Sequence, residues 1–342
     1  MRCLQNRIMF GLVLSIISSL TCRATENGPD SLVQSAKDAY EHKNYELAVS
    51  LLTEAIKFNP TAESLCARAS ARFQLGDCHG AIIDCDSVLN SDPDPEYLDV
   101  SRITRAECFI STGDYNRAIA DCTATIERNP NCKEAWFARA SIWFTLGNDK
   151  LAMSDLDHLV QMAPDYFDAY VLRSQCYQSK NEWANAIADI DKAIRSNDKE
   201  SDWFVIRGFA HIGSKAYKDA LADFQQAARL NESNSIATVA ECIILVACPQ
   251  TDLRDPPLAI KLAKKMCANT ESNDCLRLSF LASIYAQEAD FPNAVLWQQK
   301  AVDIATLERK QIATDRLILF KSGKPLFIAS KTDFDVIIKN WR

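Results

Sequence analysis

The sequence predicts an all-α protein, a right-handed α-solenoid of about eight helical hairpins with a C-terminal capping helix. One alanine recurs at intervals of 33, 37, 34, 34 and 34 residues, and a second small residue precedes it by twelve positions. Within each half-repeat, apolar residues fall at i, i+3, i+4 and i+7, the period of an amphipathic helix. Because one hairpin cannot bury its apolar side alone, neighbouring hairpins are expected to stack. The alanines are Ala48, Ala81, Ala118, Ala152, Ala186 and Ala220, preceded by Ala36, Ala69, Ala106, Ala140, Ser174 and Gly208.

Glycine and proline mark where the predicted helices end. A glycine between the two halves of a repeat suits a helix C-terminus, because glycine adopts the left-handed conformation without strain. A proline closes four of the second halves, since proline cannot continue a helix. Only 9 glycines and 11 prolines occur in 342 residues, which disfavours collagen, low-complexity disorder and loop-rich β folds. The turn glycines are Gly76, Gly113 and Gly147, and the prolines are Pro60, Pro93, Pro130 and Pro164.

The repeated sequence resembles the tetratricopeptide repeat. Members of that family have small residues at positions 8, 20 and 27 of a 34-residue repeat, a bulky residue at position 4 and proline at position 32. The fourth repeat here has Trp136, Ala140, Ala152 and Pro164 at positions 4, 8, 20 and 32, and departs from the family with Leu159 at position 27. The resemblance implies stacked helical hairpins whose first helices line a concave binding face.

The repeats divide the chain into segments. Six well-formed repeats cover residues 29–232, and two degenerate repeats cover 233–306, with an inserted loop at 249–257. We expect a capping helix and turn over 307–325, followed by a C-terminal tail at 326–342. The runs ACPQTDLRD, AIKLAKKMC and RLILFKSGKP resemble a subgroup of exported bacterial tetratricopeptide proteins.

Residues 1–24 have the pattern of a secretory signal peptide. Arg2 and Arg7 precede an uncharged run at 8–20, and small residues lie before a possible cleavage site after Ala24. That run of thirteen residues is shorter than the roughly 20 that span a bilayer, so we favour cleavage over a retained anchor. We therefore expect an exported protein, periplasmic or extracellular, without an integral membrane segment after removal of the signal.

An arginine and an aspartate recur together in the middle repeats. Position 7 is arginine and position 23 is aspartate in the second to sixth repeats, whereas the first and eighth have neither. These positions face each other across an antiparallel hairpin, which predicts a partly buried ion pair, or rung. A ligand track lined by guanidinium groups is the alternative; we favour rungs because a desolvated guanidinium and carboxylate usually pair. The rungs are Arg68–Asp84, Arg105–Asp121, Arg139–Asp155, Arg173–Asp189 and Arg207–Asp223.

The thirteen cysteines allow two interpretations. Most lie at helical core spacing, where cysteine acts as a small hydrophobic residue. The same antiparallel pairing places Cys66 opposite Cys85 in one hairpin, which makes them a possible disulfide in an exported protein. Both also occupy core positions, so a reduced pair is equally consistent with the sequence.

The sequence contains no pattern of residues for catalysis. No C-x-x-C pair occurs and the four histidines are scattered, so we expect no metal site. No nucleophile–base set or phosphate-binding loop is found, and we predict neither enzymatic activity nor a cofactor. A net charge of −7 without runs of lysine or arginine disfavours nucleic-acid binding.

The first helices of the repeats supply the candidate binding residues. Family members commonly use positions 2, 5, 9, 12 and 13 of these helices. Here position 2 is often acidic, position 5 is apolar and position 9 varies. Such a lining suits an extended partner segment with apolar anchors and basic residues; packing of the same aromatic side chains between helices is the alternative. The predicted groove residues are Phe73, Glu134, Phe137, Ser141, Phe144, Asp168, Gln175, Gln178 and Phe209.

Together these patterns predict a non-catalytic scaffold that binds a protein or peptide in the concave groove. The alternative is an accessory or regulatory subunit of an exported enzyme or of a secretion or assembly complex. The sequence identifies neither the partner nor the oligomeric state.

Overall fold

A computed structural model describes residues 29–91, 93–268 and 274–326. The predicted signal peptide at 1–24 and the tail from residue 327 lie outside this part of the chain. The described residues form helices and turns, without a β-strand. They fall into two compact arrays, which we describe separately: an N-terminal array ending at Cys176 and a C-terminal array beginning at Tyr177.

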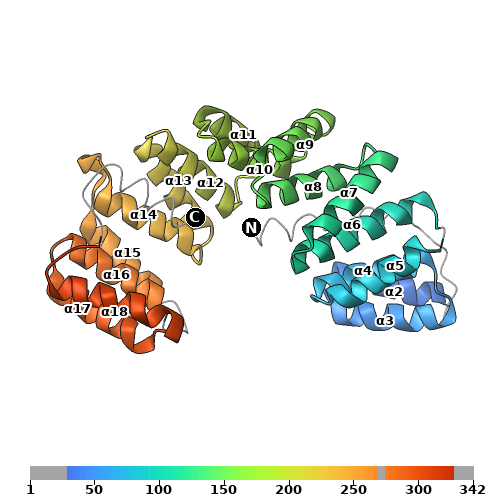
Figure 1. Cartoon of the computed structure of the whole chain (residues 1–342), viewed down its shortest axis with the longest axis horizontal. Helices are drawn as coiled ribbons and strands as arrows, with labels where there is room; N and C mark the ends of the chain where they lie inside the picture. The colour runs from blue at the N-terminus through green and yellow to red at the C-terminus, as the bar shows by residue number, and fades with distance from the viewer. Residues whose placement is uncertain (1–28, 92, 269–273, 327–342) are drawn as a thin grey trace. The chain divides into compact units, whose positions relative to one another are not determined.

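The N-terminal array consists of helical hairpins in which each helix packs against the next (Figure 1). The same contacts join one hairpin to its neighbour, as between α3 and α4 or between α5 and α6. The helices are α2 (Pro29–Glu41), α3 (Tyr45–Phe58), α4 (Ala62–Gln74), α5 (Cys78–Leu89), α6 (Pro95–Thr112), α7 (Tyr115–Arg128), α8 (Lys133–Thr145), α9 (Asp149–Met162) and the first part of α10 (Phe167–Ser179).

The C-terminal array continues the same arrangement and ends in a single helix that packs on the last hairpin. A short 3-10 helix interrupts the seventh hairpin, where the sequence predicts an inserted loop. The helices are α11 (Trp183–Ser196), α12 (Ser201–Gly213), α13 (Tyr217–Leu230), α14 (Ser235–Ala247), η1 (Thr251–Leu253), α15 (Pro256–Ala268), α16 (Cys275–Gln287), α17 (Phe291–Ile304) and α18 (Leu307–Lys321). The prediction of an all-α chain of stacked hairpins is confirmed.

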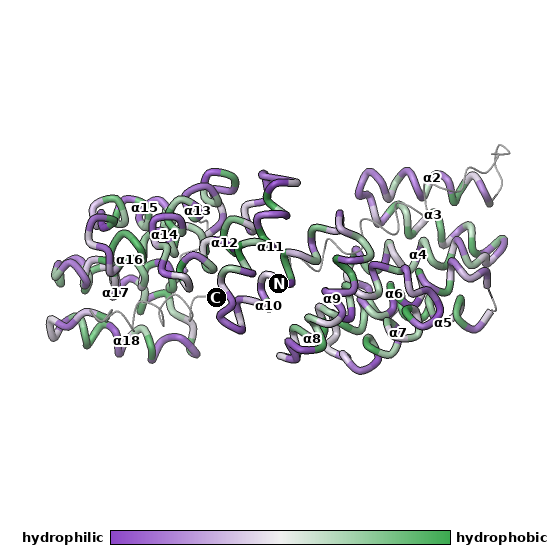
Figure 2. Tube along the Cα trace, turned by 90° about the horizontal axis from the view of Figure 1, so that it is seen from above, coloured by the Kyte–Doolittle hydropathy of each residue, from purple (hydrophilic) through white to green (hydrophobic). Residues whose placement is uncertain are grey.

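The recurring small residues lie where helices approach most closely. All six recurring alanines are completely buried, as are Ala69, Ala106, Ala140 and Ser174 among the residues that precede them. A Cβ atom added at Gly208 would stand 2.7 Å from the ring of Phe224, so α12 and α13 meet there without room for a side chain. Apolar and polar residues are mixed along the helices (Figure 2), and the buried apolar ones form the core between neighbouring helices.

A residue with positive φ makes the turn in most hairpins. Gly76, Gly113 and Gly147 have φ of 81°, 80° and 73°, as expected for glycine after a helix C-terminus. Four other turns place a residue with a side chain in this left-handed region, with φ of 58° to 65°. These are Lys43, Asn181, Lys215 and Ala289. An Asn or Asp often follows the turn and caps the second helix, as Asn148 does by accepting from the Leu151 amide.

No helix within residues 29–91, 93–268 and 274–326 is long and apolar enough to cross a membrane.

Candidate partner-binding site

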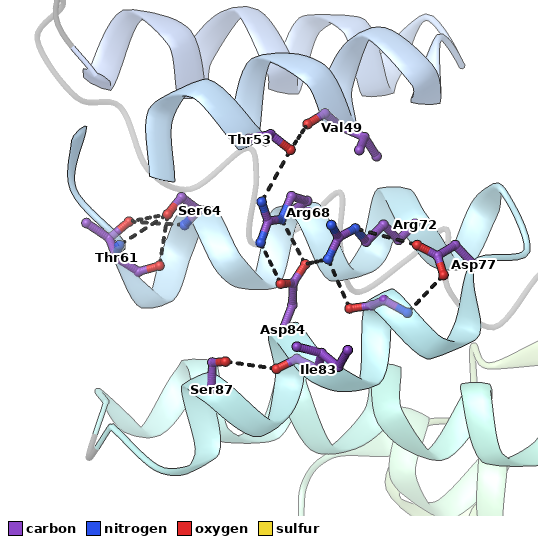
Figure 3. Close-up of polar contacts among 11 residues, drawn as sticks. Val49, Thr53, Thr61, Ser64, Arg68, Arg72, Asp77, Ile83, Asp84 and Ser87 are labelled. Carbon is purple, nitrogen blue, oxygen red and sulfur yellow. Dashed lines mark hydrogen bonds and ion pairs between the residues drawn. The ribbon is translucent and has the colours of Figure 1, made fainter. Parts of the chain in front are cut away.

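The arginine–aspartate rungs lie inside the hairpins, between the two helices (Figure 3). In the second hairpin, Arg68 donates from Nε and Nη2 to the two carboxylate oxygens of Asp84, at 2.9 and 2.7 Å. Arg72 donates to the same carboxylate at 2.8 Å. Asp84 is only 1% exposed, so these charge-assisted bonds replace the water that a buried carboxylate has lost.

Three further hairpins have the same fork geometry. In each, Nε and Nη2 of the arginine donate to the aspartate carboxylate at 2.6 to 3.0 Å, and the aspartate is no more than 6% exposed. The pairs are Arg105–Asp121, Arg139–Asp155 and Arg207–Asp223. Arg173 and Asp189 belong to different arrays, so the fifth rung stays a prediction.

Each rung arginine also contacts the preceding hairpin, which the sequence analysis did not anticipate. Nη1 of Arg207 donates to Asp191 at 2.7 Å, and Nη1 of Arg173 donates to Asp157 at 2.8 Å. The corresponding acceptors for the other three arginines are Thr53, Asp86 and Thr123. Each of these acceptors lies at position 25 of its repeat, where an Asp or Thr recurs in the sequence, and that recurrence could have predicted the contact. The rung arginines therefore join neighbouring hairpins.

This bonding leaves the arginines little capacity for a ligand. Hydrogen bonds to Asp121 raise the pKa of the Arg105 guanidinium above its ordinary value. The same cause, hydrogen bonding to Asp223, raises the pKa of Arg207. The guanidinium groups of the rung arginines therefore have a structural role, because their N–H donors are bonded within the array.

Several predicted groove residues are part of the interior instead. Phe137 is 1% exposed and its ring meets Tyr166 edge-to-face, with ring centres 5.4 Å apart. Gln178 is 5% exposed and donates from Nε2 to the Ile206 carbonyl at 3.0 Å. These two residues do not line an open groove, because core packing and a backbone acceptor already occupy them. Ser141 donates to the Phe137 carbonyl at 2.9 Å.

The other predicted residues of the N-terminal array and of α10 are at least half-buried. Phe73 and Phe144 pack against core clusters, and Glu134 is 8% exposed beside the Cys132 thiol. Asp168 and Gln175, both on α10, are half-buried. Only Phe209, among the nine predicted residues, lies at a described cavity.

That cavity opens between the first helices of three successive hairpins, α12, α14 and α16. Its volume is about 150 Å³. Large apolar side chains form most of its wall, while Ser235, Asp274 and Arg277 supply polar atoms. Ile236 and Leu276 remain 46% and 42% exposed. We call this the apolar pocket; its apolar wall includes Phe209, Ile236, Val239, Ile243, Leu276 and Phe280.

Capping interactions fix the helices that form the pocket. Asn234 accepts from the Ala237 amide at 3.1 Å and so begins α14. The Asn234 side-chain amide also donates to Asp202 at 3.1 Å, which leaves that exposed carboxylate on α12 next to the start of α14. Asp274 begins α16 by accepting from the Leu276 amide at 2.9 Å. The pocket wall therefore stands on rigid helices.

The sequence analysis missed most of this pocket because it lies in the degenerate repeats. A signal was nevertheless available at position 2 of the repeats. That position is apolar in the third repeat, at Val100, and in the seventh and eighth, whereas it is acidic in the other five, at Asp30, Glu63, Glu134, Asp168 and Asp202. Ile236 and Leu276 are the apolar replacements, and an exposed apolar side chain at a recurrently acidic position indicates a change of surface.

The sequence analysis raised a possible Cys66–Cys85 disulfide, and both residues are free thiols in the structure. The Cys66 sulfur turns toward α6, where it lies 3.2 Å from the Ser101 hydroxyl. Burial raises the pKa of Cys66 to about 12. Among the described residues, no group of three or more His, Cys, Asp or Glu side chains forms a candidate metal site.

Glu107 is a buried acid outside the rungs. Glu107 on α6 is 4% exposed, and neither of its carboxylate oxygens has a hydrogen-bond partner among the described residues. Burial without a partner favours the neutral form and raises the pKa of Glu107 well above its ordinary range.

A tetratricopeptide repeat family model matches residues 104–167, which span parts of the third to fifth hairpins. Residues 104–167 therefore match tetratricopeptide repeats. Solved structures extend the likeness in fold over most of the chain. Yeast Tom70 is 17% identical, covers 89% of this chain and 66% of its own, and has a TM-score of 0.56.

Two bacterial tetratricopeptide structures show the same fold. The C-terminal part of a repeat protein from Cytophaga hutchinsonii is 15% identical, covers 70% of this chain and 96% of its own, with a TM-score of 0.53. A tetratricopeptide repeat protein from Parabacteroides merdae is 14% identical, covers 86% of this chain and 98% of its own, and has a TM-score of 0.50. No curated protein gives a significant sequence match. At these sequence identities, the structural likeness shows a shared fold and does not identify the function of this chain.

Proposed function

We propose that this tetratricopeptide repeat protein is a non-catalytic interaction scaffold that binds an extended segment of a partner protein. One apolar side chain of that segment occupies the apolar pocket between α12, α14 and α16. The fold itself supports a role in binding proteins. The observation that carries the finer proposal is the pocket, where Ile236 and Leu276 keep 46% and 42% of their surface in water on the face made by the first helices.

The size and lining of the pocket favour a phenylalanine side chain as the anchor. An apolar cavity of about 150 Å³ is large enough to hold benzene, and the apolar pocket, although open to the surface, has this volume. The phenyl ring of phenylalanine matches that size, and its burial contributes about 1.5–3 kcal/mol. Aromatic anchors of this kind dominate the energetics of many protein interfaces.

Charge at the rim favours a basic residue beside that anchor. The exposed carboxylate of Asp202 lies next to the start of α14, whereas Asp274 at the start of α16 is already paired with Arg277 at 3.6 Å. The chain as a whole carries a net charge of −7. A lysine or arginine next to the phenylalanine would gain favourable electrostatic interactions and faster association.

A peptide array tests this proposal with the purified protein. Extended segments carrying phenylalanine beside a basic residue are expected to bind, and replacing that phenylalanine by alanine should weaken binding about tenfold to a hundredfold. Ile236→Asp, which puts a charge at the pocket rim, should abolish the preference. Leu47→Asp is the matched control, because Leu47 on α3 is also 46% exposed. Equal binding by both variants, or no preference for the aromatic residue, would contradict the proposal.

We also propose that the protein is exported. The support is the order of the first 24 residues, with cations before an uncharged run and small residues after it. Mass spectrometry of the protein recovered from cell fractions tests this. A mature chain beginning near residue 25 in the exported fraction agrees with the proposal, and a full-length chain in the cytosol contradicts it.

A further inference from the structure

Four cysteine sulfurs gather between α4, α5 and α6 of the N-terminal array. Cys85 and Cys108 belong to one buried cluster with Ala69 and Ala81, and Cys78 packs against this cluster. Burial raises the pKa of the Cys85 thiol, and the neighbouring Cys66 and Cys108 thiols add to that rise. All four are free thiols.

These thiols differ in access to solvent. Cys66, Cys85 and Cys108 are 5%, 0% and 0% exposed. Cys78, in the first turn of α5, is half-buried and is the most exposed of the four residues. A dissolved oxidant can reach the cluster at Cys78 and not at the other three.

The Cys78 sulfur lies against the C-terminal part of α6. It stands 2.9 Å from the Ser111 hydroxyl, which in turn donates to the Cys108 carbonyl at 2.9 Å. Cys78 also packs against the buried cluster that contains Cys108, and the neighbouring Cys78 thiol adds to the rise that burial causes in the pKa of Cys108. The accessible sulfur therefore has a buried sulfur as its immediate neighbour, on the next hairpin of the array.

We propose that Cys78 and Cys108 form a reversible redox pair, whose disulfide ties α5 of the second hairpin to α6 of the third. The oxidant is a small-molecule disulfide. The Cys78 thiolate attacks one sulfur of that molecule, breaks its S–S bond and releases one equivalent of thiol, which leaves a mixed disulfide on Cys78. The Cys108 thiolate then attacks the Cys78 sulfur, forms the internal disulfide and releases the second thiol. The two protein thiols are oxidised, and their protons end on the two released thiols.

The structure selects this pair over Cys66 and Cys85, the pair considered from the sequence. Both of those thiols are buried, and the Cys66 sulfur is engaged with Ser101, so no oxidant reaches either one first. The second step at Cys108 depends on pH. Burial raises the pKa of the Cys108 thiol, so its thiolate is scarce at neutral pH and closure of the disulfide should accelerate as the pH rises.

The test treats the folded, reduced full-length protein with glutathione disulfide, alkylates the remaining thiols and maps the peptides by mass spectrometry. We expect a crosslinked peptide that joins Cys78 to Cys108 and is lighter by two hydrogen atoms, formed faster at higher pH. Cys78→Ser should abolish it, and Cys108→Ser should leave glutathione attached to Cys78. Cys122→Ser is the control, because Cys122 is completely buried on α7 and its loss should leave the crosslink intact.

Two results would overturn the proposal. One is a glutathione adduct on Cys78 of the unaltered protein that never converts to the crosslink as the pH is raised. The other is a Cys66–Cys85 crosslink in the folded protein. Circular dichroism of each variant confirms that it has folded, and the mapping of the unaltered protein stands independently of the variants. This inference does not rest on the proposed function.

Discussion

Removal of one arginine from a rung should cost more stability than removal of the whole rung. Arg139 donates from Nε and Nη2 to Asp155 at 2.8 and 2.9 Å, and the Asp155 side chain is 8% exposed. Arg139→Leu leaves that carboxylate buried without its two charge-assisted bonds. Loss of one partner from such a pair typically costs about 3–5 kcal/mol. Urea unfolding followed by circular dichroism measures the difference.

The aspartate and the double variant complete the cycle. Asp155→Leu leaves Arg139, whose side chain is 17% exposed, with Thr123 as a remaining acceptor at 3.1 Å. We expect a smaller loss there, about 1.5–3 kcal/mol, since the guanidinium can turn toward water. The double variant should lose less than Arg139→Leu alone, and therefore less than the sum of the two, because no unpaired charge stays buried.

An exposed ion pair provides the control for this cycle. Lys57 and Glu54 lie 2.6 Å apart with side chains 65% and 52% exposed, so removing either should change stability by about 0–1 kcal/mol. Additive losses at Arg139 and Asp155 would refute the rung interpretation. So would a loss at Arg139 no larger than that at Lys57.

Three further predictions follow from single positions. Because burial raises the folded-state pKa of Glu107, its ionisation opposes folding; this cost in stability is absent below the unfolded-state pKa of about 4.3 and grows as the pH rises toward the folded-state pKa. In urea titrations from pH 4 to 8, Glu107→Gln should therefore become progressively more stable than the unaltered protein. Stability curves that run parallel over this pH range would contradict the prediction. Gly208→Ala should lower stability by about 1–3 kcal/mol, since its Cβ would stand 2.7 Å from the Phe224 ring; an unchanged melting temperature would argue against close helix approach. Ala289→Gly should raise stability by about 1 kcal/mol, because glycine adopts a φ of 58° without strain, whereas Gly113→Ala, at a φ of 80°, should lower stability. Thermal melts in which Ala289→Gly lowers and Gly113→Ala raises the melting temperature would exclude backbone strain as the cause.

Repeat spacing was sufficient to predict the fold. The recurring alanines and their small partners identified the contacts between helices, because only small side chains fit where two helices approach closely. The same spacing placed Arg68 opposite Asp84, where the structure has a bidentate pair. Contacts within one hairpin follow directly from its antiparallel geometry.

Contacts between hairpins were harder to predict. The bond from Arg207 to Asp191 of the preceding hairpin depends on how two repeats stack, which a single repeat does not encode. The sequence left Phe137 open between a groove position and a core position; the structure places it in the core, where the ring of Tyr166, just before α10, meets it edge-to-face. Ile236 and Leu276 of the apolar pocket belong to the seventh and eighth repeats. These repeats match the 34-residue pattern too weakly for their binding positions to be predicted from the sequence.

Crosslinking from the pocket rim tests the central claim most directly. A photoreactive amino acid at position 236 is compared with one at position 47, since both positions are 46% exposed in the folded chain. The captured peptides are sequenced by mass spectrometry. We predict that position 236 captures segments carrying phenylalanine next to a basic residue and that position 47 does not. Equal capture at the two positions, or captured segments without a shared aromatic residue, would contradict the claim that the pocket holds a partner's side chain.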